Sequence, residues 1–278
     1  MAQFKIVTDS SSDVLKLDTT PFASAPLKII TANKEYVDDE HLNVEEMVND
    51  LQGYKGRSST SCPNADDWLQ TFGDADFVFC VTITGTLSGS YNSALSAKNI
   101  YEETYPDRKV FVLDSKSTGP EIALILEKLE ELISANEEFD TICEKIIGYS
   151  QSTRLLFMLE SLQNLANNGR VNSLVAKMAG ILGIRLVGKA SAKGDLEPLN
   201  KCRGEHKALE ATVDNMKKEG FGGGKVIIAH CFNEAVANAL KEMIKAEFPS
   251  SVIKIYNCRG LCSFYAEKGG FLMGFETK

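Results

Sequence analysis

Histidine is scarce in this sequence of 278 residues, which holds only His41, His206 and His230. None of the three has a second histidine four residues further on, so the paired zinc ligands of many metalloproteases are missing. The serine-hydrolase motif G-x-S-x-G is also missing, because Gly85-Thr-Leu-Ser-Gly89 has the wrong spacing. A serine-hydrolase function is therefore possible only if His230 approaches the serine-rich loops from a distant part of the chain.

Motifs for nucleotides and metals are lacking too. Neither a Walker A nor a G-x-G-x-x-G pattern occurs, and the glycine-rich segment from Gly220 to Lys225 fits neither. Among the cysteines only Cys258 and Cys262 lie close together, and a lone pair at that spacing is weak evidence for a metal site. We therefore expect no metal and no cofactor. The seven cysteines, odd in number and scattered, favour reduced thiols in a cytoplasmic protein.

Long hydrophobic runs are absent as well. No apolar stretch approaches the roughly 18 residues that a membrane-spanning helix needs, and the first residues lead into a strand pattern without a signal-peptide core. We expect a cytoplasmic protein that contacts membranes transiently at most. The net charge of −8 speaks against nucleic acid as a partner, because a phosphate backbone selects basic surfaces.

The charge is divided unevenly along the chain. Residues 1–150 hold 12 Lys and Arg against 26 Asp and Glu, a net charge of −14, whereas residues 151–278 hold 18 against 12, a net charge of +6. A chain of this length accommodates two domains, which we place at 1–150 and 151–278. The basic second half suits an acidic or phosphate-bearing partner, although such asymmetry also arises by chance.

The stretch from Phe77 to Lys98 is the most informative part of the sequence. An apolar run from Phe77 to Val81 predicts a strand buried on both faces. A turn rich in glycine and hydroxyl groups follows, and a helix begins near Ser90, with Ser88 or Ser90 as the expected N-cap. The N-terminus of a helix favours an anion. An ordinary strand-to-helix turn would have the same pattern.

Two other predicted strands run into similar loops. The strand at 4–7 is followed by Thr8-Asp-Ser-Ser-Ser-Asp13, and the strand at 110–113 by Asp114-Ser-Lys-Ser-Thr-Gly119. In an open parallel sheet the C-terminal strand ends lie along one edge, where ligands bind. We therefore expect the three loops to line one polar pocket.

The rest of the chain continues the alternation of strands and helices. Further strands are predicted at 27–30, 154–158, 184–188, 195–200, 225–229 and 252–256, with a hairpin turn at Lys193-Gly194. Helices are predicted at 44–52, from 65 onward, and at 121–134, 139–150, 161–167, 173–182, 205–218 and 234–247. Residues 34–39 are interpreted as a polar connection, and residues 269–275 as a final strand that closes a sheet.

Six short motifs in this order resemble the DegV family of bacterial fatty-acid-binding proteins. They are Thr8-Asp-Ser-Ser-Ser-Asp, Thr60-Ser-Cys-Pro, Leu87-Ser-Gly-Ser-Tyr, Asp114-Ser-Lys-Ser, the segment Leu165 to Arg170, and Lys201-Cys-Arg-Gly. Each is weak alone, but together they cover most of the chain. The resemblance implies two α/β domains, an N-terminal one with a Rossmann-like parallel sheet and a C-terminal one with a mixed sheet. A fatty acid would occupy a tunnel at their junction.

The resemblance also implies a site. Thr60 and Ser88 would meet the carboxylate of a long-chain fatty acid, with Ser61 and Gly89 beside them. Where the family commonly has a histidine near the C-terminus, Tyr265 stands here, which can donate a hydrogen bond but cannot be cationic. Well-studied members of the family deliver the fatty acid to a separate kinase subunit, so the resemblance implies that the protein itself is a non-catalytic lipid-binding subunit.

Cys62 stands where the family often has glutamine. Arg170 follows a turn glycine and Arg203 precedes a predicted helix, so either could hold a phosphate or an acidic partner surface; ordinary surface arginines are the alternative. A small-molecule enzyme, either a serine hydrolase or a phosphotransferase that uses the hydroxyl-rich loops, remains the alternative function.

Overall fold

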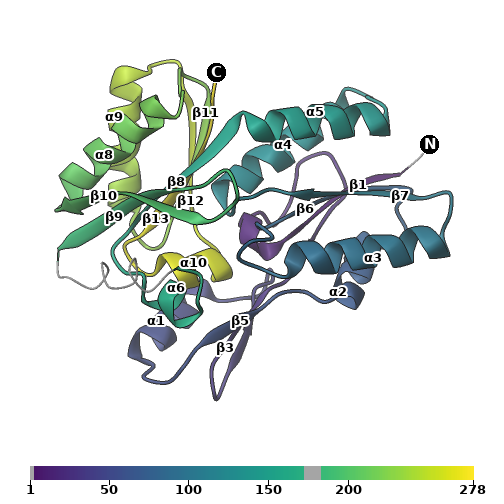
Figure 1. Ribbon diagram of the computed structural model, residues 1–278, viewed down its shortest axis with the longest axis horizontal. Helices are drawn as coiled ribbons and strands as arrows, with labels where there is room; N and C mark the ends of the chain where they lie inside the picture. The colour runs from purple at the N-terminus through teal and green to yellow at the C-terminus, as the bar shows by residue number, and fades with distance from the viewer. Residues whose placement is uncertain (1–2, 172–182) are drawn as a thin grey trace.

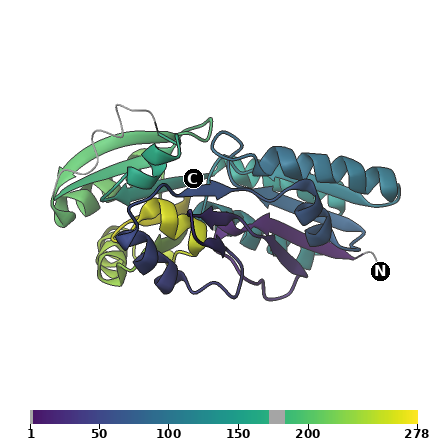
Figure 2. The same cartoon turned by 90° about the horizontal axis from the view of Figure 1, so that it is seen from below.

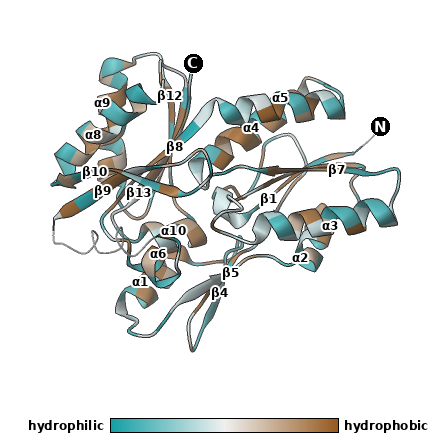
Figure 3. Cartoon of the chain, in the orientation of Figure 1, coloured by the Kyte–Doolittle hydropathy of each residue, from teal (hydrophilic) through white to brown (hydrophobic). Residues whose placement is uncertain are grey.

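The computed structural model describes residues 3–171 and 183–278, and these form an α/β fold with three sheets (Figure 1). The helix predicted at 173–182 lies outside the described residues. The outer helices mix polar and apolar residues, whereas the strands they cover are largely apolar (Figure 3). No helix in the described part of the chain is long and apolar enough to cross a bilayer.

A four-stranded parallel sheet forms one half of the molecule. Its order is β2 (Phe22–Ala25), β1 (Phe4–Asp9), β6 (Phe77–Thr82) and β7 (Lys109–Asp114). Helices α2 (Ala65–Phe72) and α3 (Ser90–Thr104) cover one face, and α4 (Pro120–Ser134) and α5 (Phe139–Gln151) cover the other. Because helices cover both faces of this sheet, the side chains of β6 are buried on both sides, which agrees with its uninterrupted apolar sequence.

A six-stranded mixed sheet forms the other half. Its order is β10 (Leu196–Arg203), β9 (Ile184–Ala190), β8 (Thr153–Leu159), β13 (Phe271–Glu276), β11 (Lys225–His230) and β12 (Val252–Asn257). Only β11 and β12 pair in parallel among these described strands. Helices α8 (Glu205–Lys218) and α9 (Glu234–Glu247) pack on one face, and α10 (Gly260–Ala266) and α6 (Gln163–Asn167) lie on the opposite one.

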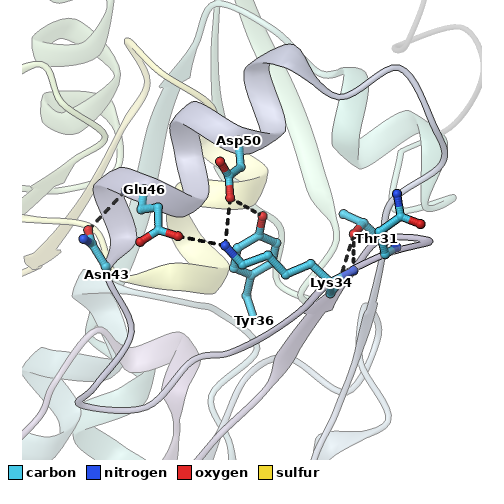
Figure 4. A network of polar contacts seen from close by, with 7 residues as sticks. Thr31, Lys34, Tyr36, Asn43, Glu46 and Asp50 are labelled. Carbon is cyan, nitrogen blue, oxygen red and sulfur yellow. Dashed lines mark hydrogen bonds and ion pairs between the residues drawn. The ribbon is translucent and has the colours of Figure 1, made fainter.

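A small antiparallel sheet lies at the lower end of the molecule in Figure 1. It consists of β4 (Glu35–Val37), β3 (Lys28–Ile30) and β5 (Ser59–Ser61), and α1 (Val44–Gly53) follows β4. Lys34 pairs with Glu46 and Asp50 of α1 at 2.8 and 2.9 Å, and Tyr36 donates to Asp50 at 2.8 Å (Figure 4). These contacts fasten the β3–β4 hairpin to α1.

The small sheet packs on the second half of the chain. Ile29, Tyr36 and Met47 share one apolar cluster with Phe157 and Phe264, and α1 lies against α10, the yellow helix in Figure 2. Strands of the parallel sheet come from the first 114 residues and strands of the mixed sheet start at 153. The domain boundary at residue 150 stays a prediction.

Several sequence predictions need correction. Residues 34–39 are not a plain connection, because β4 lies within them, and residues 59–61 form β5. Strand β2 and helix α10 were not predicted at all. The predicted C-terminal strand is present as β13, and it lies in the middle of the mixed sheet, antiparallel to both β8 and β11. Gly274 of β13 lets α4 pack closely on this strand, since a Cβ there would lie 2.6 Å from the backbone of Glu121 in α4.

Candidate functional site

An apolar cavity of about 280 Å³ lies where the small sheet, the N-terminus of α3, helix α10 and the mixed sheet meet. Much of its wall is aliphatic or aromatic, including Leu27, Ile83, Leu155, Phe157, Leu159 and Leu272. All five residues that the sequence suggests for lipid binding line it: Thr60, Ser61, Ser88, Gly89 and Tyr265. Segments far apart in the chain thus form one enclosure with few polar groups.

Strand β5 places Thr60 and Ser61 in the wall. Its antiparallel pairing with β3 sets Thr60 opposite Ile29, and the chain then turns at Pro63 into α2. Asn64 caps α2 reciprocally with Asp67, so the end of β5 is fixed by a capping box. The Thr60 hydroxyl lies 2.8 Å from the Tyr265 hydroxyl, and either oxygen can donate.

The turn before α3 supplies Ser88 and Gly89. Gly89 is the N-cap residue of α3, so the expectation that Ser88 or Ser90 holds this position is wrong; instead the Ser88 hydroxyl accepts the Ser90 N–H at 3.3 Å. A Cβ on Gly89 would lie 3.2 Å from the Cys62 sulfur. The absence of a side chain therefore lets the β5 loop and the α3 turn approach each other at the cavity.

Tyr265 comes from α10, a helix that the sequence pattern does not reveal. Burial raises the pKa of its phenol, while the hydrogen bond with Thr60 and the charge of Arg170 oppose that rise. The phenol is therefore neutral and able to donate a hydrogen bond. Tyr265 can therefore offer the cavity a neutral hydrogen-bond donor.

Two buried aspartates from the N-terminal half hold the start of α10. Asp38 accepts the N–H groups of Gly260 and Leu261 at 2.9 and 2.8 Å, and Asp13 accepts the Arg259 N–H at 2.9 Å. Burial raises the pKa of both carboxyls, that of Asp13 to about 8, and these N–H donors oppose the rise. Nothing in the sequence signals these contacts, since more than 200 residues separate the partners.

The two arginines named from the sequence have different positions. Arg170 lines the cavity: its Nε donates to the Leu87 carbonyl at 3.1 Å, and its Nη1 donates to the Asn168 carbonyl. Gly169 adopts a φ of 69°, which shapes the turn that carries Arg170. Arg203 is exposed at the end of β10 and does not line the cavity.

The expected polar pocket of three hydroxyl-rich loops does not form. The loops do meet, but largely through bonds to each other: Asp9 accepts from the Ser11 and Ser90 hydroxyls and from the Ile83 N–H. Of the loops at 8–13 and 114–119, only Thr118 reaches the cavity. Burial raises the pKa of Asp9, and its four hydrogen-bond donors oppose this. These hydroxyls fix the sheet edge and do not line the cavity.

The cavity lining also bears on the sequence-based alternative of a serine hydrolase that uses His230. The residues that line it include no histidine and no carboxylate among those described. His230 is buried elsewhere, its Nδ1 accepting the Asn233 N–H at 3.2 Å, and burial lowers its pKa. The described residues also contain no group of three or more His, Cys, Asp or Glu that could hold a metal ion.

Comparison with known proteins connects this cavity to a family. A family model described as an uncharacterised protein of the DegV family matches residues 3–277. A DegV domain-containing protein of Streptococcus pneumoniae is 45% identical over 277 residues, which cover 98% of this chain and 99% of the relative.

Two solved structures share the fold and carry lipid. A DegV family protein from Eubacterium eligens, loaded with heptadecanoic acid, has a TM-score of 0.97 and 45% identity, covering 99% of this chain and 100% of its own. The Fatty Acid Kinase (Fak) B3 protein of Streptococcus pneumoniae, loaded with linoleic acid, gives the same TM-score, identity and coverage. The α/β fold with its parallel and mixed sheets is therefore that of proteins that hold a fatty acid.

Proposed function

Because the chain belongs to the DegV family, we propose that it binds a long-chain fatty acid, with the carboxylate at Thr60 and Ser88 and the acyl chain in the apolar cavity. The cavity carries this proposal, since its few polar groups accompany a wall of aliphatic and aromatic side chains. The related proteins from Eubacterium eligens and Streptococcus pneumoniae, each loaded with a fatty acid, support it.

Burial of the acyl chain supplies most of the affinity in this proposal. Each CH₂ group removed from water contributes about 0.8 kcal/mol, so a long chain gains on the order of 10 kcal/mol before other costs are counted. Lost rotational and translational freedom of the ligand offsets a large part of that gain. A few polar contacts then suffice to fix the orientation of the chain.

The polar groups orient the carboxylate. Thr60 and Ser88 would donate hydroxyl hydrogen bonds, with Ser61 and the Gly89 backbone beside them. Tyr265 would orient Thr60 through their 2.8 Å contact, and Arg170 would supply the positive charge at the cavity wall. On this view residues 1–150 carry the carboxylate-binding loops, and residues 151–278 close over the lipid.

The protein would present its ligand to a separate kinase subunit, which forms the acyl phosphate. The relative named as the Fak B3 protein supports a kinase partner. On this proposal the protein is a binding subunit, and the kinase subunit carries out the chemistry. Arg203, exposed and outside the cavity, would contact the acidic or phosphate-bearing partner.

Organic extraction of the purified protein followed by mass spectrometry tests this function. We expect close to one long-chain fatty acid per protein chain when the host makes such lipids. The same protein, stripped of lipid with a lipid-absorbing resin, serves as the control and should take up added fatty acid again. Repeated recovery of no stoichiometric fatty acid, together with no uptake, would contradict the proposal.

A further inference from the structure

Strand β8 presents every second side chain to the cavity. Leu155, Phe157 and Leu159 line it, whereas Leu156 and Met158 pack into the core on the other face of the mixed sheet. This is the ordinary alternation of a strand. The three inward residues form part of the apolar wall contributed by the mixed sheet. The hydroxyls of the proposed carboxylate site come from β5, the α3 turn and α10 instead.

The ring of Phe157 has an unusual neighbour. Phe157 pairs directly with Gly188 of β9, and a Cβ on Gly188 would lie 2.4 and 2.6 Å from the Cζ and Cε2 atoms of that ring. Real Cβ atoms do not approach other atoms so closely, so the ring occupies the space that any other residue at position 188 would fill. Phe157 therefore leans along the sheet onto Gly188.

We propose that Phe157, lying over Gly188, sets the depth of the cavity and thereby the length of acyl chain that the protein accepts. The inference rests on the proposed fatty-acid function and adds to it the residue that selects among chains. Phe157 is 3% exposed and lies opposite Leu272 of β13, which also lines the cavity. The ring is therefore a buried part of the apolar wall contributed by the mixed sheet, and an acyl chain whose head lies at the hydroxyls of β5 and the α3 turn would end against it.

The glycine matters because a side chain at position 188 would meet both the Phe157 ring and the backbone of the neighbouring strand. A methyl group at position 188 would also lie 2.7 Å from the Glu197 carbonyl oxygen on the adjoining strand β10. The methyl group cannot retreat toward that backbone, so it would push the Phe157 ring away from the sheet and into the cavity. Gly188→Ala should make the cavity shallower, and Phe157→Ala should make it deeper.

Titration of lipid-free protein with saturated fatty acids of increasing chain length tests the inference. Phe157→Ala should shift the preferred length upward, because each additional buried CH₂ raises affinity about fourfold. A chain two carbons longer than the wild-type optimum should gain roughly 15-fold relative to that optimum. Met158→Ala is the matched control: it removes a large side chain from the neighbouring position on the opposite face and should leave the length profile unchanged.

Gly188→Ala should shift the preference toward shorter chains. If strain at Glu197 prevents this variant from folding, Phe157→Trp can replace it. Its larger ring system should also shift the preference toward shorter chains. A folded Phe157→Ala protein with the wild-type length profile would overturn the inference, as would an equal shift in Met158→Ala. A wild-type protein that binds no fatty acid of any length would instead contradict the proposed function, so the two failures are distinguishable.

Discussion

The hydroxyl groups of Thr60 and Tyr265 lie 2.8 Å apart and join two segments separated by 205 positions in the chain. A hydroxyl has one hydrogen to donate and can accept at the same time. If Tyr265 donates to Thr60, the hydrogen of Thr60 remains available for a carboxylate. On the proposed function, the neutral tyrosine would position the threonine for the carboxylate.

Tyr265→Phe should lower fatty-acid affinity roughly two- to tenfold, since a neutral hydrogen bond contributes about 0.5–1.5 kcal/mol. The acyl cavity should persist because the ring is retained. Tyr36→Phe is the matched control, because it removes a phenol hydroxyl that bonds Asp50 and does not line the cavity. Fluorescent fatty-acid displacement gives the affinities, and equal values for both variants and the wild type would count against the positioning role.

Helix α10 is an element that the sequence pattern does not predict. Its seven residues form a helix whose first N–H groups are taken by Asp38 and Asp13, both distant in sequence. Periodicity over so short a segment carries little information. By contrast α9 follows its apolar period closely, and its observed bounds, Glu234–Glu247, are those predicted from the sequence.

The buried carboxyl of Asp13 predicts a pH dependence of stability. Its pKa is raised from 3.8 to about 8, chiefly by burial, so between these values the folded protein holds a proton that the unfolded chain has lost. The contribution of Asp13 to the free energy of unfolding is fully present below about pH 4 and is lost as the pH rises toward 8. The Asp13→Asn variant should lack this part of the decrease in the free energy of unfolding.

Urea unfolding of wild type and Asp13→Asn from pH 5 to pH 8.5 measures the effect. Asp18→Asn, a change at an exposed aspartate five residues away, serves as the control and should follow the wild-type curve. Parallel curves for Asp13→Asn and wild type would show that Asp13 does not titrate in this window.

For the whole molecule, local pattern predicted most strands and helices but not how they assemble. The segment at 269–275 has the pattern of a strand, yet its central place between β8 and β11 depends on pairing across more than 100 residues for β8. The hydroxyl-rich loops predict a polar pocket because hydroxyls can bind ligands, whereas in the fold Asp9 accepts hydrogen bonds from Ser11 and Ser90. Competition among internal partners is invisible in a sequence.

The proposed site residues were found by resemblance and not by periodicity. Thr60, Ser88 and Tyr265 come from β5, the turn before α3 and α10, and they line one cavity only in the folded chain. Their motifs are short, and the chemistry of each alone is ordinary. The apolar wall that completes the cavity could not be assigned either, because a leucine facing a cavity and a leucine in a core have the same sequence pattern.

The central claim is that Thr60 and Ser88 jointly hold a fatty-acid carboxylate at the mouth of an apolar cavity. Titration of the Thr60→Ala/Ser88→Ala double variant with a fluorescent fatty acid tests it most directly. A hydrogen bond to a charged group contributes about 1.5–3 kcal/mol, so each single variant should bind roughly 10- to 150-fold more weakly and the double variant most weakly of all, with circular dichroism unchanged. A folded double variant with wild-type affinity would contradict the account.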